Sequence, residues 1–95
     1  PGSEGQVLSG DIRQLRIERD RQEKRCNKAI AEVDQIERRI EREAAAGHDT
    51  RAWAGRLETA ARHRDEVQAK LNALNDRIEE LEVGYSARRA VRRFR

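Results

Sequence analysis

Aromatic residues, proline and cysteine are all scarce in this sequence. Of its 95 residues only 3% are aromatic, one is proline and none is methionine, whereas 41% are charged. A chain this short, with so few large apolar side chains, cannot enclose a large globular core around a buried substrate cavity. The composition is instead typical of a long helix or a coiled coil.

Long apolar runs are also missing, and cysteine occurs once. The single Cys26 excludes a disulfide within the chain and agrees with a reducing compartment. No run of 18 apolar residues and no charged-then-apolar leader occurs, so neither a membrane span nor a classical secretion signal is predicted. We expect the cytoplasm, or delivery by a non-classical route. The opening "PGS" resembles a remnant of tag removal, so we interpret residues 1–10 as remnant and leader of a segment from a longer protein.

Apolar residues recur with a 4-3 spacing in two long stretches, which are called here the two seams. The first seam holds Arg19 and Gln22 among apolar residues at positions 8, 12, 15, 19, 22, 26, 29, 33, 36 and 40. The second holds Arg64 among apolar residues at positions 53, 57, 60, 64, 67, 71, 74, 78, 81 and 85. This spacing predicts two helices that pack along their seams as a coiled coil.

The stretch "GHDT" between the seams predicts a turn. Gly47 suits the left-handed conformation that ends a helix, and Asp49 or Thr50 suits the cap of the next one. At the other end, Ser9 or Asp11 is expected to cap the first helix. A short connection makes neighbouring helices antiparallel. We therefore predict an all-α antiparallel coiled-coil hairpin, which would form a four-helix bundle if two copies paired, with helices at about 11–46 and 50–83, a turn at 47–49 and a basic tail at 84–95.

Charge supports the antiparallel arrangement. Folding back at the turn places the mainly basic residues 13–28 beside the mainly acidic residues 69–84. The register predicts ion pairs Arg16–Glu82 and Glu18–Arg77, each worth at most about 1 kcal/mol. Such pairs contribute more to the choice of orientation than to stability.

The polar residues within the seams admit two interpretations. In the first, the stems of Arg19 and Arg64 lie along the seam while their charged heads reach solvent. In the second, these layers stay incomplete until another chain covers them, because so small a hairpin often needs a partner for stability. A homodimer or a larger protein would provide that cover. The candidate partner-binding residues lie in these layers, off the seam on the first helix, and at the turn: Arg19, Arg64, Ile17, Ile30, His48 and Arg51.

No group of side chains in the sequence predicts chemistry. His48 and His63 would lie roughly 20 Å apart along the hairpin, with Cys26 about midway down it, whereas zinc ligands must converge within about 2.0–2.3 Å of one ion. His48 and Asp49 have no serine or cysteine beside them to act as a nucleophile. We therefore expect no catalytic residue, no cofactor and no metal, and we predict that the chain is not an enzyme.

Two short resemblances accompany this interpretation. The stretch "WAG" at Trp53 to Gly55 resembles the W-x-G between the helices of a family of small secreted helical hairpins. That family carries an acidic residue four positions after a tyrosine, whereas Tyr85 is followed by Arg89, and the match covers three residues. The hairpin shape resembles the arm of transcript-cleavage factors, whose acidic tip would correspond here to Asp49 alone. We adopt neither family.

The last ten residues, "SARRAVRRFR", concentrate positive charge. The whole chain has a net charge of +3, and five arginines lie in this tail: Arg88, Arg89, Arg92, Arg93 and Arg95. They suit a solvated helix end that favours the negative C-terminal dipole, or contacts with phosphates or an acidic partner. We predict a non-catalytic protein–protein interaction module, serving as a coiled-coil adaptor or an oligomerisation segment. The alternative is a nucleic-acid-binding adaptor that uses the tail and the basic residues of the first helix: Arg13, Arg16, Arg21, Lys24, Arg25 and Lys28.

Overall fold

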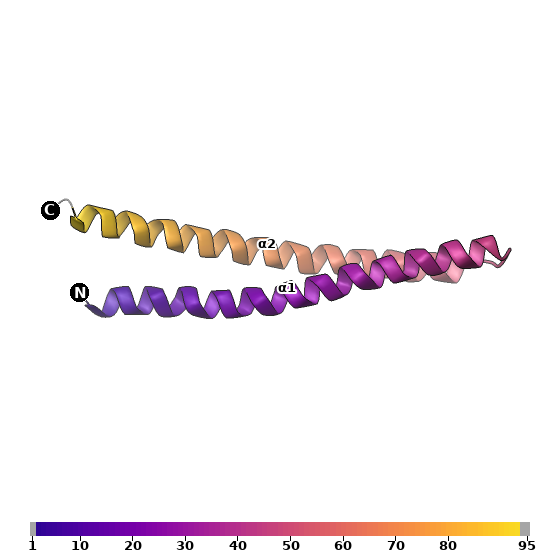
Figure 1. Cartoon of the computed structure of the whole chain (residues 1–95), viewed down its shortest axis with the longest axis horizontal. Coiled ribbons are helices and arrows are strands. Elements are labelled where there is room, and N and C mark those ends of the chain that lie inside the picture. Colours follow the sequence, from indigo (N-terminus) through magenta and orange to yellow (C-terminus); the bar gives the residue numbers. More distant parts are fainter. Residues whose placement is uncertain (1, 94–95) are drawn as a thin grey trace.

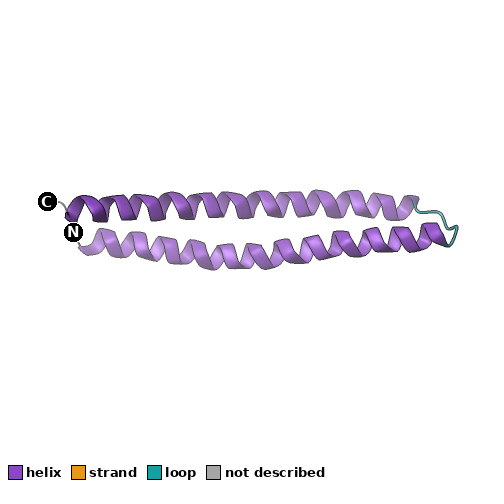
Figure 2. Cartoon of the chain, turned by 45° about the horizontal axis from the view of Figure 1, so that its top comes forward, coloured by secondary structure: helices purple, strands orange, loops and turns teal. Residues whose placement is uncertain are grey.

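Two long helices make up the computed structural model of this chain (Figure 1). Helix α1 spans Gly2–Ala45 and helix α2 spans Arg51–Arg93. The structure describes the backbone of residues 2–93 and the side chains of residues 10–84. The helices lie side by side and antiparallel, with both chain ends at one end of the rod and the turn at the other (Figure 2). The rod measures 74 × 19 × 14 Å, and the predicted all-α hairpin is confirmed.

Both helices extend further than the sequence predicted. Helix α1 begins at Gly2 instead of at residue 11, and helix α2 ends at Arg93 instead of at residue 83. Ser9 and Asp11 therefore lie inside α1, and the prediction that one of them caps it is wrong. Isolated glycines such as Gly10 and Gly84 cost a helix only about 1 kcal/mol each, so they weaken these helices without ending them.

The turn ends α1 as the sequence predicted. Gly47 has a φ of 80°, in the left-handed region that glycine adopts without steric cost. Its N–H donates to the carbonyl of Ala44 at 3.0 Å, and the N–H of His48 donates to the carbonyl of Glu43 at 2.9 Å. These two bonds form the Schellman motif, which satisfies carbonyls that a helix end otherwise leaves without partners.

The start of α2 is held by a side-chain cap. Asp49 Oδ1 accepts a hydrogen bond from the backbone N–H of Arg51 at 3.0 Å. The carbonyl of Thr50 accepts the next helical bond, from the N–H of Ala54 at 2.8 Å. Asp49 thus fills the capping role that the sequence predicted for Asp49 or Thr50.

The two seams form the interface between α1 and α2, because every seam residue with a described side chain is buried or half-buried. The centre of this interface consists of small side chains that are almost fully covered: Cys26 (2% exposed), Ala29 (3%), Val33 (4%) and Val67 (4%). Towards the turn the seam residues are larger and only half-buried: Ile36, Ile40, Trp53 and Leu57. Towards the chain ends two large seam residues are buried again, Ile12 (8% exposed) and Ile78 (4%).

The three polar side chains within the seams are accommodated in two ways, one buried and two reaching the surface. Gln22 is only 8% exposed, and its Oε1 has no hydrogen-bond partner although its Nε2 donates to Glu18 Oε1 at 3.0 Å. The two seam arginines are half-buried along their stems. Their heads meet acidic neighbours on their own helices: Arg19–Asp20 at 3.4 Å and Arg64–Asp65 at 3.1 Å. This arrangement agrees with stems along the seam and heads at the surface.

One of the two predicted ion pairs between the helices forms. Arg16 pairs with Glu82 across the hairpin, as the antiparallel register requires. Glu18 and Arg77 do not pair, so that prediction is wrong. Arg77 lies 3.4 Å from Glu80 on its own helix, and Glu18 accepts the bond from the nearby glutamine. Neighbours three or four positions away on one helix are closer competitors than residues on the facing helix.

Candidate functional site

The seams divide the outer surface of the rod into two flanks of opposite charge. The basic flank adjoins seam residues such as Ile36 and Trp53. It carries eight Lys/Arg and five Asp/Glu, a net charge of +3. Its charged residues are Asp11, Glu18, Arg21, Arg25, Lys28, Glu32, Arg39, Arg42, Arg56, Glu66, Lys70, Arg77 and Glu80, and it also contains His63. The acidic flank lies on the other side of the seams. It carries three arginines and nine Asp/Glu, a net charge of −6. Its charged residues are Arg13, Arg16, Asp20, Glu23, Asp34, Glu37, Glu41, Arg51, Glu58, Asp65, Glu79 and Glu82. These memberships follow from heptad position.

Contacts across the hairpin agree with this division. The pair Arg16–Glu82 joins the helices on the acidic flank. Glu32 of α1 lines one groove together with Arg56 and His63 of α2, all on the basic flank. Both helices therefore contribute to each flank, and the flanks carry opposite net charge in the part of the hairpin formed by residues 23–70.

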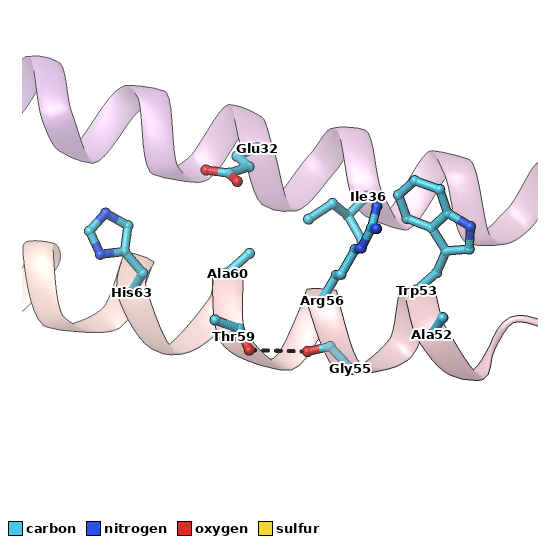
Figure 3. Close-up of a pocket in the computed structure, with 9 residues that line it drawn as sticks. All are labelled: Glu32, Ile36, Ala52, Trp53, Gly55, Arg56, Thr59, Ala60 and His63. Atoms are coloured by element: carbon cyan, nitrogen blue, oxygen red, sulfur yellow. Dashed lines mark hydrogen bonds between the residues drawn. The ribbon is translucent and has the colours of Figure 1, made fainter.

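The groove on the basic flank lies near the turn and has a volume of about 800 Å³ (Figure 3). Trp53, Ile36 and Ala60 supply its apolar surface, whereas Arg56 extends from α2 towards α1 beside the indole. Space remains here because α2 carries several small side chains on this side: Ala52, Gly55, Thr59 and Ala60. An open groove with an apolar floor and charged rims suits a protruding side chain of another molecule.

Trp53 is the centre of a cluster of arginines. The Cζ atom of Arg56 lies 4.7 Å from the centroid of the indole, and that of Arg39 lies 5.2 Å away. Both distances are within the range of a cation–π interaction. Arg39 also pairs with Glu43, at 2.9 Å, whereas Arg56 forms no ion pair with any described side chain. The guanidinium of Arg56 therefore retains hydrogen-bond donors for a partner.

His48 closes the turn onto α1. Its Nδ1 lies 2.6 Å from Oε2 of Glu43. This hydrogen bond, with a further contribution from Arg39, lowers the pKa of Glu43 below its ordinary value of 4.5. His48 was predicted as a partner-binding residue. In the structure its exposed ring forms a hydrogen bond to the end of α1. Arg51 is exposed beside it at the start of α2.

The structure does not bring the other predicted partner-binding residues together. Ile17 and Ile30 are 43% and 46% exposed. They lie 13 residues apart on α1, roughly 20 Å along its axis, with Ile17 on the back of the helix and Ile30 on the acidic flank. Val83, which the sequence analysis did not select, is also exposed on the back of α2. The side chains of the tail arginines lie outside the described residues: Arg88, Arg89, Arg92, Arg93 and Arg95.

Sequence reasoning missed Glu43, Arg39 and Arg56. The four-residue spacing of Arg39 and Glu43 is a signal for a helical ion pair that could have been used. The position of Arg56 three residues after Trp53 could have indicated the stacking of its guanidinium on the indole. The groove itself has no such signal, because it depends on how far apart the two helices lie.

Within residues 10–84, no three His, Cys, Asp or Glu side chains gather in a group that could hold a metal ion. Neither helix, as far as it is described, has a segment long and apolar enough to cross a membrane. The buried thiol of Cys26 donates to Gln68 Oε1 at 3.1 Å, so it belongs to the interface between the helices.

Comparison of the chain with known proteins found no match. No protein-family model, no curated protein and no solved structure aligns with it. Its function is therefore argued from the shape, charge and exposed side chains of the hairpin.

Proposed function

We propose that this hairpin is a non-catalytic protein–protein interaction module, acting as a coiled-coil adaptor or an oligomerisation segment. The observation that carries the proposal is its two-sided surface, on which a groove containing Trp53 and Arg56 interrupts the basic flank. Tryptophan and arginine are the residues that most often dominate binding at protein interfaces. Complementary charge around them selects the partner and its orientation.

Incomplete burial of the large seam residues supports the same proposal. Leu15, Leu71 and Leu74 are only half-buried although they lie within the seams. A partner helix that covered them would stabilise the assembly by about 25 cal/mol for each Å² of apolar surface removed from water. A homodimeric four-helix bundle is one arrangement that gives such cover, and the half-buried Arg19 and Arg64 would then lie near the contact.

A nucleic-acid-binding adaptor is the second candidate, and the basic flank favours it. Arg25, Lys28 and Lys70 form no ion pair with the described side chains, so their charges are available to phosphates. Glu18, Glu32 and other carboxylates lie among them, which weakens a continuous phosphate-binding track. Binding through phosphates would fall linearly with the logarithm of salt concentration, whereas a packed protein interface depends less on salt.

Site-specific photo-crosslinking in cells that make the protein tests the proposal. Benzoylphenylalanine replaces Arg51 at the turn or Ile17 on the back of α1, with Asp76 on the back of α2 as the control position. We expect adducts from 51 or 17 that nuclease treatment leaves unchanged. Adducts that nuclease removes would favour the second candidate. The absence of adducts from Arg51 and Ile17, in a chain that also does not self-associate, would contradict the proposed protein–protein function. Mass spectrometry shows whether the captured protein is another copy of this chain.

A further inference from the structure

We propose that copies of this hairpin associate side by side, with the basic flank of one copy on the acidic flank of the next, and with Ile30 of one copy in the groove beside Trp53 of its neighbour. This proposal rests on the proposed function of protein–protein recognition. It names the partner as a second copy of this chain and identifies the two surfaces that meet.

Charge complementarity is the first support. The basic flank has a net charge of +3 and the acidic flank a net charge of −6, and they lie on opposite sides of one rod. Each copy therefore presents both members of a complementary pair of surfaces. Contacts between like flanks would bring equal charges together, which costs binding energy and disfavours that arrangement.

A protruding apolar side chain is the second support. Ile30 is 46% exposed, and it is the one large exposed aliphatic residue on the acidic flank within the described side chains. Glu23 and Glu37 lie seven residues before and after it on α1, each roughly 10 Å away along the helix axis. Neither carboxylate has an ion-pair partner among the described side chains. Ile30 is thus an apolar protrusion between two available carboxylates.

The groove on the basic flank has the complementary arrangement. Its apolar surface is formed by Trp53, Ile36 and Ala60, with Arg56 between Trp53 and Ala60 along α2. Glu32 lines the end of the groove that faces the chain ends, and Lys28 lies one turn further along α1. Lys28 lies eight residues from Ile36 on α1, roughly 12 Å along the axis. Neither Arg56 nor Lys28 has an ion-pair partner among the described side chains. An isoleucine with a carboxylate on each side therefore fits an apolar groove that contains Arg56 and has Lys28 further along the same flank.

The geometry predicts the kind of assembly. Because two different surfaces meet, each contact leaves one basic and one acidic flank open, so copies add in a row or close into a ring. A four-helix bundle with twofold symmetry would instead use the same surface of both copies and would stop at the dimer. Side-by-side association should also weaken as salt screens the charges of the flanks.

Complementary charge reversal tests the proposal on the full chain. One variant carries Lys28→Glu and Arg56→Glu, which makes both flanks acidic. The other carries Glu23→Lys and Glu37→Lys, which changes the net charge of the acidic flank from −6 to −2 and places a cation on each side of Ile30. Sedimentation at tens of micromolar and low salt should show assemblies larger than a dimer for the unaltered chain and 11 kDa monomers for each variant alone. An equimolar mixture should associate again, because the unaltered acidic flank of the first variant meets the unaltered basic flank of the second.

Matched controls separate the flank contact from general attraction between oppositely charged proteins. Reversal of two charges on the backs of the helices, Lys24→Glu with Arg62→Glu, should leave assembly unchanged. Ile30→Ala should weaken assembly at least about tenfold, as expected when a buried apolar anchor is truncated. The control Val83→Ala, at an exposed position on the back of α2, should have no effect, and circular dichroism should show that every variant is helical.

Three outcomes would overturn the proposal. They are a monomeric unaltered chain under these conditions, assembly that Ile30→Ala does not weaken, and a salt-insensitive dimer that does not grow. A salt-insensitive dimer would leave the proposed function standing through a four-helix bundle. A monomer that nonetheless crosslinks to a different protein would also leave it standing. The proposed function fails only when the chain neither self-associates nor crosslinks to any protein.

Discussion

The centre of the hairpin and its turn-proximal part are built from the same two helices, yet they cover their seam residues differently. The central residues are small and nearly inaccessible: Cys26, Ala29, Val33 and Val67. The residues near the turn are large and half-buried: Ile36, Ile40, Trp53 and Leu57. Size alone does not decide this difference, because Ile12 and Ile78 are large and yet only 8% and 4% exposed nearer the chain ends.

This difference locates stability and recognition in different places. The centre holds the most completely covered side chains, although Arg64 and Leu71 are half-buried there. The turn-proximal part leaves apolar surface accessible, and the groove beside Trp53 lies there. Substitutions in the centre should therefore act mainly on folding, whereas substitutions around the groove should act mainly on association. The following predictions test that separation.

Enlarging a residue in the sealed centre should have the largest effect. Ala29→Leu inserts three carbon atoms where the alanine is 3% exposed, and overpacking of this kind costs about 1–3 kcal/mol. Urea unfolding followed by circular dichroism measures the loss. Ala31→Leu, at an exposed position two residues away on the same helix, is the control and should change stability by less than about 0.5 kcal/mol. Equal stability of the two variants would show that the centre is not sealed.

Removing the unpartnered amide from the seam should stabilise the hairpin. Gln22 is buried and its Oε1 accepts no hydrogen bond, so Gln22→Leu should raise the free energy of unfolding by about 1 kcal/mol. The same unfolding measurement applies. Gln14→Leu, at an exposed position on α1, should be nearly neutral. A destabilised Gln22→Leu variant would mean that the amide contributes to the interface despite its free oxygen.

Two glycine substitutions near the turn should have opposite signs. Gly47 has a φ of 80°, so Gly47→Ala should cost about 1 kcal/mol even though an added Cβ would meet no atom within 4 Å. Gly55 lies within α2, where an added Cβ likewise meets nothing, so Gly55→Ala should stabilise the helix by about 0.5–1 kcal/mol. Melting temperatures of both variants give the comparison. Effects of the same sign would contradict the assigned backbone conformations.

The smallest effect concerns the pH dependence of the turn. The hydrogen bond from His48, with help from Arg39, lowers the pKa of Glu43 below 4.5. Ionised Glu43 therefore contributes stability above its ordinary pKa, and this contribution is lost as pH falls through the lowered pKa. The difference in melting temperature between the unaltered chain and Glu43→Gln should shrink on acidification. Glu41→Gln, an exposed neighbour, is the control, and a difference that grew at low pH would reverse the assignment.

Much of the fold follows directly from the sequence. The 4-3 spacing selects the faces that meet, and Gly47 with Asp49 ends one helix and begins the next. Opposite charges set the register that Arg16 and Glu82 confirm. The start of α1 was not predictable from capping residues, because elongation of an existing helix costs less than its nucleation, so it continues past potential caps such as Ser9 and Asp11.

Some features of the candidate site can likewise be read from the sequence, whereas others depend on the tertiary structure. Positions in the heptad alone separate the basic flank from the acidic one, and the spacing of Ile30 from its carboxylates can be read from the sequence. Tertiary structure alone decided that Trp53 lies under two arginines, that Gln22 is left with a free oxygen, and that a groove opens where α2 has small side chains. The physical reason is that periodicity determines which direction a side chain faces, whereas its burial and its contacts depend on the distance between the helices and on the sizes of all the side chains packed there.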